Sequence, residues 1–409
     1  METLRFLMAT THFPPEHLGG DAVFVEYLSK ELLRRGHEVH VFHSPASYEL
    51  LRDARPIVPD AAVDGGLKRH RYISKLGRLY PVLSLSLGLW GGAENSLKEL
   101  TRDVKPDVVH WHNTKGLIGR PFESDGALCL YTAHDYTTVC PRSNLLRADM
   151  SICRTPKLCT ICHLRWRKPP QLWRAGKNRR VVSIPEQMKI ISLSDFVAKR
   201  LGEDGIRVHK IIRGFVPDRG GDVGRDSSSP DTIVYVGLLE YHKGLLQLLD
   251  AFIKTRDEQG FKLAIIGEGT LKGELKRRVE KHGLGDRVSI PGFLSREEVE
   301  ATRKASAVQI VPSVWYENAP STILEAYSLG LPVIASDIGG LPEIVGPDSG
   351  SVLFPMGDVD RLARLLVDAW LTRDSLNARR RMARKTYETR FSPDAHLSHY
   401  LKTISELVR

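Results

Sequence analysis

Short apolar runs alternate with stretches of helical periodicity along most of the chain. Residues 4–9 form a compact apolar run, residues 22–33 repeat apolar positions at helical spacing, and residues 39–42 are mostly apolar again. The second half resumes this order, with an apolar run at 232–236 and a helical stretch at 245–252. Strand, loop, helix and strand in succession are typical of Rossmann-like units. We therefore expect an α/β fold built from two such domains.

The length of the chain and one polar segment indicate where the domains divide. With 409 residues, the chain is long enough for two domains that each bury a core. Residues 220–230 are rich in Gly, Asp and Ser, the composition of a linker. We predict a first domain at 1–215, a linker at 216–230 and a second domain at 231–388.

The segment 311–345 predicts a helix start that binds an anion. Pro320 suits the first helical position, because its missing N–H would be unpaired there anyway. Apolar residues then recur on one helical stripe until Gly330, which ends the helix. Residues 332–335 predict a short buried strand. The free N–H groups and the dipole of a helix that starts at the carboxyl edge of an α/β sheet favour anions such as phosphate.

Two carboxylates accompany this helix start. Glu317 lies in the preceding loop, and Glu325 follows eight positions later inside the helix. A carboxylate would be repelled by phosphate, so each is better suited to accept hydrogen bonds from sugar hydroxyls beside it. The alternative is that the acids only stabilise the positive end of the helix.

The same segment carries a family resemblance. Its stretches Glu-Asn-Ala-Pro-Ser-Thr-Ile-Leu-Glu-Ala, Gly-Leu-Pro-Val-Ile-Ala-Ser-Asp and Gly-Gly-Leu-Pro-Glu-Ile resemble the nucleotide-sugar site of the retaining glycosyltransferases of family 4. The resemblance runs along nearly the whole chain. It implies the GT-B fold, in which two Rossmann-like domains face each other across a cleft and a C-terminal helix, here within 389–409, crosses back to the N-terminal domain.

The resemblance also implies donor-binding residues. The glycine pair at 19–20 could hold phosphate through its N–H groups or form only a tight turn. Lys243, after the strand that ends at Gly237, would offset the diphosphate charge, although Leu238 stands where the family usually has Arg. The implied donor site consists of Gly19, Gly20, Gly237, Lys243, Gly292, Phe293, Glu317, Asn318, Ala319, Pro320, Ser321, Thr322 and Glu325.

We expect catalysis by stabilisation of the leaving diphosphate. Backbone N–H groups at 319–322, together with Lys243, would meet the negative charge that develops on it. Glu317 would accept from the donor sugar and Glu325 from the ribose. By resemblance, His134 lies near the donor sugar. We therefore predict His134, Glu317 and Lys243 as catalytic residues, without a catalytic metal.

Polar residues that follow two predicted strands suggest an acceptor site. His112 and Asn113 come after the apolar residues 108–109, and His134 follows the run 128–133. Strands of a parallel sheet present such residues at one edge. We predict His112 and Asn113 on the acceptor side, whereas the alternative for any one histidine is a structural role.

Four cysteines gather in an insertion at about 140–163. They are Cys140, Cys153, Cys159 and Cys162. Four thiolates can hold a structural zinc ion, with no open position for catalysis. The spacing matches no standard zinc finger, so free or redox-active thiols and disulfides remain alternatives. A cytosolic location argues against disulfides.

The charge of the chain favours an acidic partner. Its net charge is +10 and its pI about 9.3. Residues 165–180 contain seven basic residues, two Trp and no acid, which indicates either a solvated face or a patch that contacts an anionic membrane surface. No nucleic-acid motif accompanies the charge, so we expect no nucleic-acid partner. We found no signal peptide and no membrane-spanning run. We predict a cytoplasmic protein, peripheral on the inner face of the plasma membrane.

These expectations combine into one activity with two alternatives. We predict a retaining transferase that moves a sugar from a nucleotide-sugar, with UDP ahead of GDP or ADP, to a glycan or lipid-linked acceptor for cell-surface polysaccharide or glycoconjugate synthesis. A GT-B epimerase would act without an acceptor. An inactive membrane-associated scaffold would bind nucleotide without turnover. The donor base, the sugar, the acceptor, the linkage and the oligomeric state do not follow from the sequence.

Overall fold

The computed structural model describes residues 3–17, 19–52, 65–154, 159–174, 181–220, 231–256, 258, 260–372 and 376–407. The chain divides into two compact units. Unit 1 contains Met1–Gly214 together with Leu397–Arg409, and unit 2 contains Phe215–His396. No helix in these ranges is both long and apolar enough to cross a bilayer.

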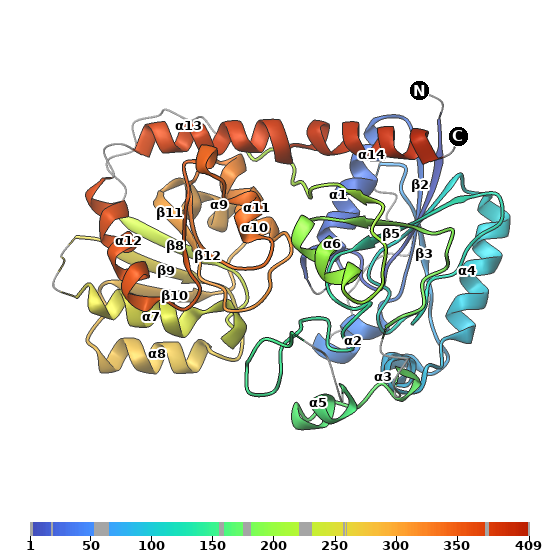
Figure 1. Cartoon of the computed structure of the whole chain (residues 1–409), viewed down its shortest axis with the longest axis horizontal. Helices are drawn as coiled ribbons and strands as arrows, with labels where there is room; N and C mark the ends of the chain where they lie inside the picture. Colours follow the sequence, from blue (N-terminus) through green and yellow to red (C-terminus); the bar gives the residue numbers. More distant parts are fainter. Residues whose placement is uncertain are drawn as a thin grey trace. The chain divides into compact units, whose positions relative to one another are not determined.

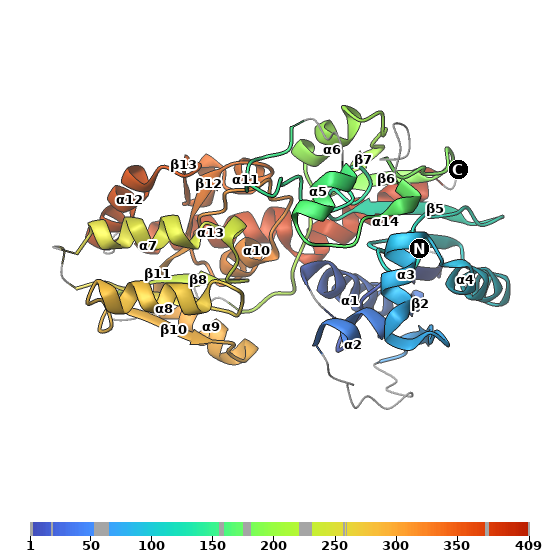
Figure 2. The ribbon, with the colours of Figure 1, turned by 90° about the horizontal axis from the view of Figure 1, so that it is seen from below.

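Unit 1 is built on a parallel sheet of seven strands in the order β3-β2-β1-β4-β5-β6-β7 (Figure 1). The strands are β1 (Arg5–Ala9), β2 (Glu38–His43), β3 (Lys68–Arg71), β4 (Val108–Trp111), β5 (Leu128–Ala133), β6 (Lys189–Ser192) and β7 (Lys210–Ile211). The helices are α1 (Gly20–Arg34), α2 (Ala46–Arg52), α3 (Tyr80–Leu87), α4 (Gly91–Val104), α5 (Cys159–Arg165) and α6 (Asp195–Gly202), with short turns η1 (Gly77–Leu79) and η2 (Leu172–Arg174). Figures 1 and 2 both show α1 and α4 on opposite sides of the sheet.

Unit 2 repeats this plan with six parallel strands in the order β10-β9-β8-β11-β12-β13. They are β8 (Thr232–Val236), β9 (Lys262–Ile266), β10 (Val288–Gly292), β11 (Ser306–Val311), β12 (Val333–Asp337) and β13 (Val352–Pro355). The helices are α7 (Leu245–Lys254), α8 (Lys272–Lys281), α9 (Arg296–Lys304), α10 (Ser321–Ser328), α11 (Leu341–Ile344), α12 (Val359–Leu371) and α13 (Leu376–Thr386), with turns η3 (Tyr241–Lys243), η4 (Pro347–Ser349) and η6 (Tyr387–Phe391). In Figure 1, α7 and α8 lie on one face of this sheet, and α9 and α10 on the other.

The strand orders place a switch point in each sheet. The order reverses between β1 and β4 in unit 1 and between β8 and β11 in unit 2. Loops after such strands diverge, which leaves a crevice at the carboxyl edge of the sheet where α/β proteins bind ligands. The predicted site segments 10–20, 112–113, 237–244 and 312–322 follow these four strands.

The C-terminal helix α14 (Pro393–Leu407) returns the chain to unit 1 from Leu397 onward. The hydroxyl of Tyr400 lies 2.7 Å from Nδ1 of His110, whose Nε2 lies 2.8 Å from the Thr132 hydroxyl. The tail is therefore tied to β4 and β5 by buried hydrogen bonds as well as by apolar packing.

The predicted α/β fold with two Rossmann-like sheets is confirmed. Strand β8 has the predicted bounds, and Ser194 caps α6 by accepting from the Val197 N–H at 3.2 Å. One detail was wrong. Pro320 is the N-cap of α10 with an extended ψ of 118°, so the helix begins one residue later, at Ser321.

Candidate functional site

The start of α10 lies at the carboxyl edge of the unit 2 sheet because its two flanking strands are almost entirely buried. Every residue of β11 is buried, and in β12 all but the last, Asp337, are buried. The core side of α10 carries Ile323, Leu324 and Tyr327, each at most 2% exposed. Gly330, at φ +66°, follows the helix in the left-handed conformation, as predicted. Packing on both sides therefore fixes where the helix begins.

Lys243 and Glu317 form an ion pair just before this helix. Nζ of Lys243 donates to Oε1 of Glu317 at 2.7 Å, and the Ser313 hydroxyl donates to the same oxygen at 2.6 Å. The ammonium also lies 5.0 Å from the centre of the Trp315 ring. Glu317 is only 4% exposed. The site therefore holds a buried carboxylate whose charge is balanced by one lysine.

Two glycines bring these side chains together. Gly244 follows η3 at φ +72°, and a Cβ there would lie 1.8 Å from the carbonyl oxygen of Pro312. A Cβ on Gly339 would lie 2.5 Å from the backbone oxygen of Glu317. No other residue fits at either position without moving the backbone. The close approach at Gly244 holds the Lys243 turn against the loop that carries Glu317.

The lysine decides the protonation of the glutamate. Burial by itself would raise the pKa of Glu317, but the nearby charge of Lys243 and the hydrogen bonds from Lys243 and Ser313 outweigh it. The net result is a pKa below the ordinary value. Glu317 is therefore an anion at neutral pH, able to accept hydrogen bonds.

Glu325 is held by an arginine that the sequence reasoning missed. Nη1 of Arg303, on α9, donates to Oε2 of Glu325 at 2.8 Å. Arg303 is 3% exposed, and its Nε donates to Oε1 of Gln309 on β11 at 2.9 Å. A buried Gln within the otherwise apolar run of β11 was the available signal, because a buried amide requires partners.

The predicted loop after β10 presents an apolar side chain to solvent. Phe293 is 81% exposed, and its backbone N–H donates to Oε1 of Glu268 at 3.1 Å. Gly292 precedes it at φ +93°. Leu238, which stands where the family usually has Arg, is 57% exposed after β8. Glu268 was not among the predicted residues, and it fixes the backbone of this loop.

In unit 1 the predicted acceptor residues lie together. Nδ1 of His112 and Nε2 of His134 are 2.9 Å apart, and Asn113 Nδ2 donates to Asp135 Oδ2 at 3.3 Å. Burial lowers the pKa of His134 to about 4, so this imidazole is neutral at pH 7. Two neutral rings can share this hydrogen bond as donor and acceptor. Gly19, at φ +123°, is the N-cap of α1, and the helix begins at Gly20.

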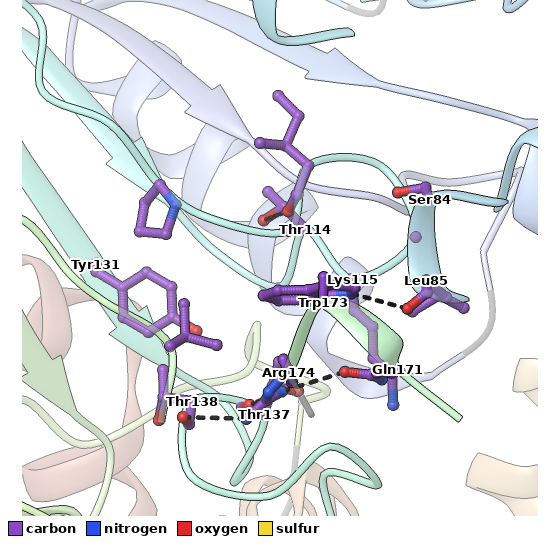
Figure 3. A pocket seen from close by; sticks show the side chains of 15 residues that line it. Ser84, Leu85, Thr114, Lys115, Tyr131, Thr137, Thr138, Gln171, Trp173 and Arg174 are labelled. Atoms are coloured by element: carbon purple, nitrogen blue, oxygen red, sulfur yellow. Dashed lines mark hydrogen bonds between the residues drawn. The ribbon is translucent and has the colours of Figure 1, made fainter. Parts of the chain in front are cut away.

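A small pocket lies beyond the ends of β4 and β5 in unit 1 (Figure 3). Its free space of about 30 Å³ has room for about one water molecule. Arg174 in its wall is 4% exposed and donates to the carbonyl oxygens of Thr137 at 2.8 Å and Thr138 at 3.3 Å. Trp173 donates through Nε1 to the Leu85 carbonyl at 2.8 Å. Of these two members of the predicted basic surface, Arg174 therefore braces the loop after β5 and Trp173 is fixed to α3.

The rest of that basic segment is partly described. Arg165, Arg167 and Lys168 are exposed, whereas Trp166 is half-buried with the Arg142 guanidinium 4.0 Å from its ring centre. The predicted cations Lys177, Arg179 and Arg180 lie outside the described residues.

The predicted zinc site gains no support from the geometry. All five cysteines are free. Among the described residues, which include Cys140, Cys153, Cys159 and Cys162, no three His, Cys, Asp or Glu side chains are arranged to hold a metal ion. Burial raises the pKa of the Cys153 and Cys162 thiols, which favours the protonated form.

Comparison with known proteins places both halves of the chain in one group. Residues 18–219 match the family described as Glycosyltransferase Family 4, and residues 224–389 match Glycosyl transferases group 1. The chain belongs to glycosyltransferase family 4. It is 32% identical over 218 residues, about half of each chain, to the putative colanic acid biosynthesis glycosyltransferase WcaL of Escherichia coli K12.

Solved structures show the fold of this family 4 member to be GT-B. The sucrose-phosphate synthase of Thermosynechococcus elongatus matches with a TM-score of 0.72 at 18% identity over 99% of each chain. HepE of Anabaena, solved in complex with UDP and glucose, matches with a TM-score of 0.66 at 17% identity over 98% of this chain and 99% of HepE.

Proposed function

We propose that this glycosyltransferase moves a sugar from a nucleotide-sugar to a glycan or lipid-linked acceptor, with retention of configuration at the sugar. The observation that carries the proposal is the buried Lys243–Glu317 pair directly before the start of α10. It places a cation for phosphate and a carboxylate for sugar hydroxyls beside the N–H groups of a helix start. These are the groups that departure of a nucleoside diphosphate requires.

Each group has one task in the transfer. Lys243 and the backbone N–H groups of Ala319, Ser321 and Thr322 stabilise the negative charge that develops on the diphosphate. Lys243 and Ser313 both donate to Oε1 of Glu317 and so fix the carboxylate. Its remaining lone pairs can accept hydrogen bonds from hydroxyls of the donor sugar. We assign the neutral His134 to the sugar as a hydrogen-bonding group and Asn113 to the acceptor. His112 is fully buried, so it would act through its 2.9 Å hydrogen bond with His134. Lys243 and the helix start take the charge-neutralising role without a catalytic metal.

Two relatives support the choice of substrates. HepE binds UDP and glucose, which favours a UDP-sugar ahead of GDP or ADP sugars. WcaL is described as a colanic acid biosynthesis glycosyltransferase, which favours an acceptor in polysaccharide synthesis. Phe293 would contact the base, and Glu325 the ribose.

A donor screen tests the proposal. A nucleotide bound at about 100 times its Kd should raise Tm by about 5 °C or more, because it binds only the native state. We expect one class of UDP, GDP or ADP sugar to do so and to release its nucleotide faster when acceptor glycans are added. Binding without turnover would favour the inactive scaffold. Interconversion of the sugar without an acceptor would favour the epimerase.

We also propose that unit 1 of the enzyme contacts an anionic membrane surface. Among its described residues, all exposed large apolar side chains except Ile211 lie on or beside α2, α3 and α5. We call this set the α2–α3–α5 surface; it comprises Leu50, Leu51, Ile73, Leu76, Leu79, Leu87, Leu89, Ile161, Leu164 and Leu172. Figures 1 and 2 show α3 and α5 at the same end of unit 1. The exposed cations Lys75, Arg165, Arg167 and Lys168 accompany them.

Vesicle flotation tests this contact. The enzyme should float with vesicles of about one-third phosphatidylserine and not with pure phosphatidylcholine, because each surface cation contributes about 1 kcal/mol at an anionic membrane. Arg165→Gln with Arg167→Gln should weaken binding about tenfold or more. The matched change on α8, Lys276→Gln with Arg277→Gln, should leave it unchanged. An equal loss of vesicle binding in the α5 and α8 variants would contradict the proposed membrane contact. Failure of the unaltered enzyme to float would contradict it as well.

A further inference from the structure

We propose that Arg303 is a positioning residue that aims Glu325 and the first turn of α10 at the ribose of the donor, an inference that rests on the proposed function. Each nitrogen of its guanidinium donates to a different residue. Nη1 donates to Glu325 Oε2 at 2.8 Å, Nη2 to Thr322 Oγ1 at 2.9 Å, and Nε to Gln309 Oε1 at 2.9 Å. One side chain on α9 thereby fixes one residue of β11 and two of α10.

Gln309 completes the same network from the sheet. Its Nε2 donates to the Thr322 carbonyl oxygen at 2.8 Å and lies 3.1 Å from the Thr322 hydroxyl. That hydroxyl in turn donates to the carbonyl oxygen of Val236, the last residue of β8, at 3.2 Å. A hydroxyl has one proton and two lone pairs, and Arg303, Gln309 and Val236 use all three. The Thr322 side chain is therefore engaged within the protein, so Thr322 can serve a phosphate only through its backbone N–H.

The network leaves one oxygen of Glu325 available. Arg303 is 3% exposed, whereas the Glu325 side chain is 23% exposed. Among the described residues, Oε2 of Glu325 accepts from Arg303, and Oε1 accepts from no residue. A carboxylate fixed at one oxygen and partly open at the other is oriented to accept a hydrogen bond from a ligand hydroxyl.

The positive charge of Arg303 also offsets the negative charge of Glu325 near the donor's diphosphate. An unpaired Glu325 within α10 would repel the phosphates that the helix start binds. Arg303 offsets this charge from the buried side while its fork fixes the carboxylate rotamer. Well-packed apolar residues generally serve stability as well as a buried ion pair does. The Arg303–Glu325 pair therefore points to orientation of the carboxylate and not to stability alone.

The test measures recognition of the ribose separately from binding of the phosphates. UDP and its 2′,3′-dideoxy form are titrated by calorimetry; if the screen selects another base, that diphosphate pair is used instead. The unaltered enzyme should prefer UDP by about 10- to 100-fold, the effect of hydrogen bonds to a charged acceptor. In Arg303→Met the preference should fall to within about twofold, and both diphosphates should bind more weakly because Glu325 is left as an unpaired anion beside the phosphates. Glu325→Gln should reproduce this loss, and the double variant should add little to it.

Controls distinguish positioning from a general defect. Arg278→Met removes an arginine of α8 that pairs with Asp250 on α7 at 2.9 Å, and it should leave the preference intact. Arg303→Lys keeps the buried charge but lacks the planar fork of the guanidinium, so it should lose most of the preference for UDP over its dideoxy form. This variant tests the positioning role if Arg303→Met does not fold.

Any one of the following results would overturn the inference. One is that Arg303→Met or Arg303→Lys retains the preference for ribose. Another is that the affinities of either variant for UDP and for its dideoxy form fall by the same factor at an unchanged Tm. Failure of the unaltered enzyme to bind any nucleoside diphosphate would overturn the proposed function together with this inference. Normal donor turnover with an unchanged ribose preference in the variants would overturn the positioning role alone.

Discussion

Glu317→Gln is expected to lower kcat/KM for the donor by about 10²- to 10³-fold, the cost of one lost charge interaction in a transition state. The amide keeps the size of the side chain but removes the anion that Lys243 and Ser313 hold at 2.7 and 2.6 Å. A neutral acceptor binds the sugar hydroxyls more weakly, and Lys243 loses the partner that orients it. Steady-state kinetics with the donor found in the screen measure the effect.

The matched control for this variant is Glu297→Gln on α9, because Glu297 is an exposed glutamate of the same unit. It should leave kcat/KM unchanged. If Glu317→Gln turns over donor at a normal rate, the sugar does not contact Glu317 and the proposed role is wrong.

Lys243→Met is expected to weaken donor binding at least tenfold and to reverse the pH dependence of stability around Glu317. In the unaltered enzyme the pKa of Glu317 is lowered, so its stabilisation is present above the unfolded pKa and is lost as pH falls through the folded pKa. Without Lys243, burial dominates and raises that pKa. The variant then loses stability as pH rises from acid toward neutral.

The size of this effect follows from leaving a buried charge unpaired. Breaking a buried ion pair costs about 3 kcal/mol at the lower end of the usual range, appropriate here because the Lys243 side chain is 20% exposed. Urea unfolding at about pH 5 and about pH 8 should show the variant closer to the unaltered enzyme at the lower pH. Lys254→Met, which removes an exposed lysine paired with Asp360, is the control. It should change the free energy of unfolding little at either pH. Equal destabilisation at both pH values would contradict the coupling of the two residues.

Local pattern was sufficient to predict the two Rossmann-like units, whereas the GT-B fold was implied by the family resemblance. Strands β8 and β9 are short apolar runs between polar turns, and such runs leave few alternatives to a buried parallel strand. The start of α10 was predicted to within one residue. The error at Pro320 arose because its fixed φ suits both an N-cap and a first helical position, and only its ψ of 118° separates the two.

Contacts between distant segments were beyond reach of the sequence pattern. Lys243 and Glu317 are 74 residues apart, and their pairing depends on how closely Gly244 approaches Pro312. Arg303 was missed because a lone arginine near the end of a charged helix is usually solvated. The inward packing of Trp173 against α3 and of Arg174 against the loop after β5 was missed for the same reason. Charge and composition do not reveal which side chains of a basic segment are buried.

The central claim is that the start of α10, together with the turn at Lys243, holds the diphosphate of the donor. Amide hydrogen exchange of the unaltered enzyme with and without UDP, or the diphosphate that the screen selects, tests it most directly. We predict slower exchange within 319–323 and 237–244 when the nucleotide is bound, because the phosphates accept from N–H groups at the helix start and the bound nucleotide shields both segments from solvent. Saturating nucleotide with unchanged exchange in both segments would contradict the claim.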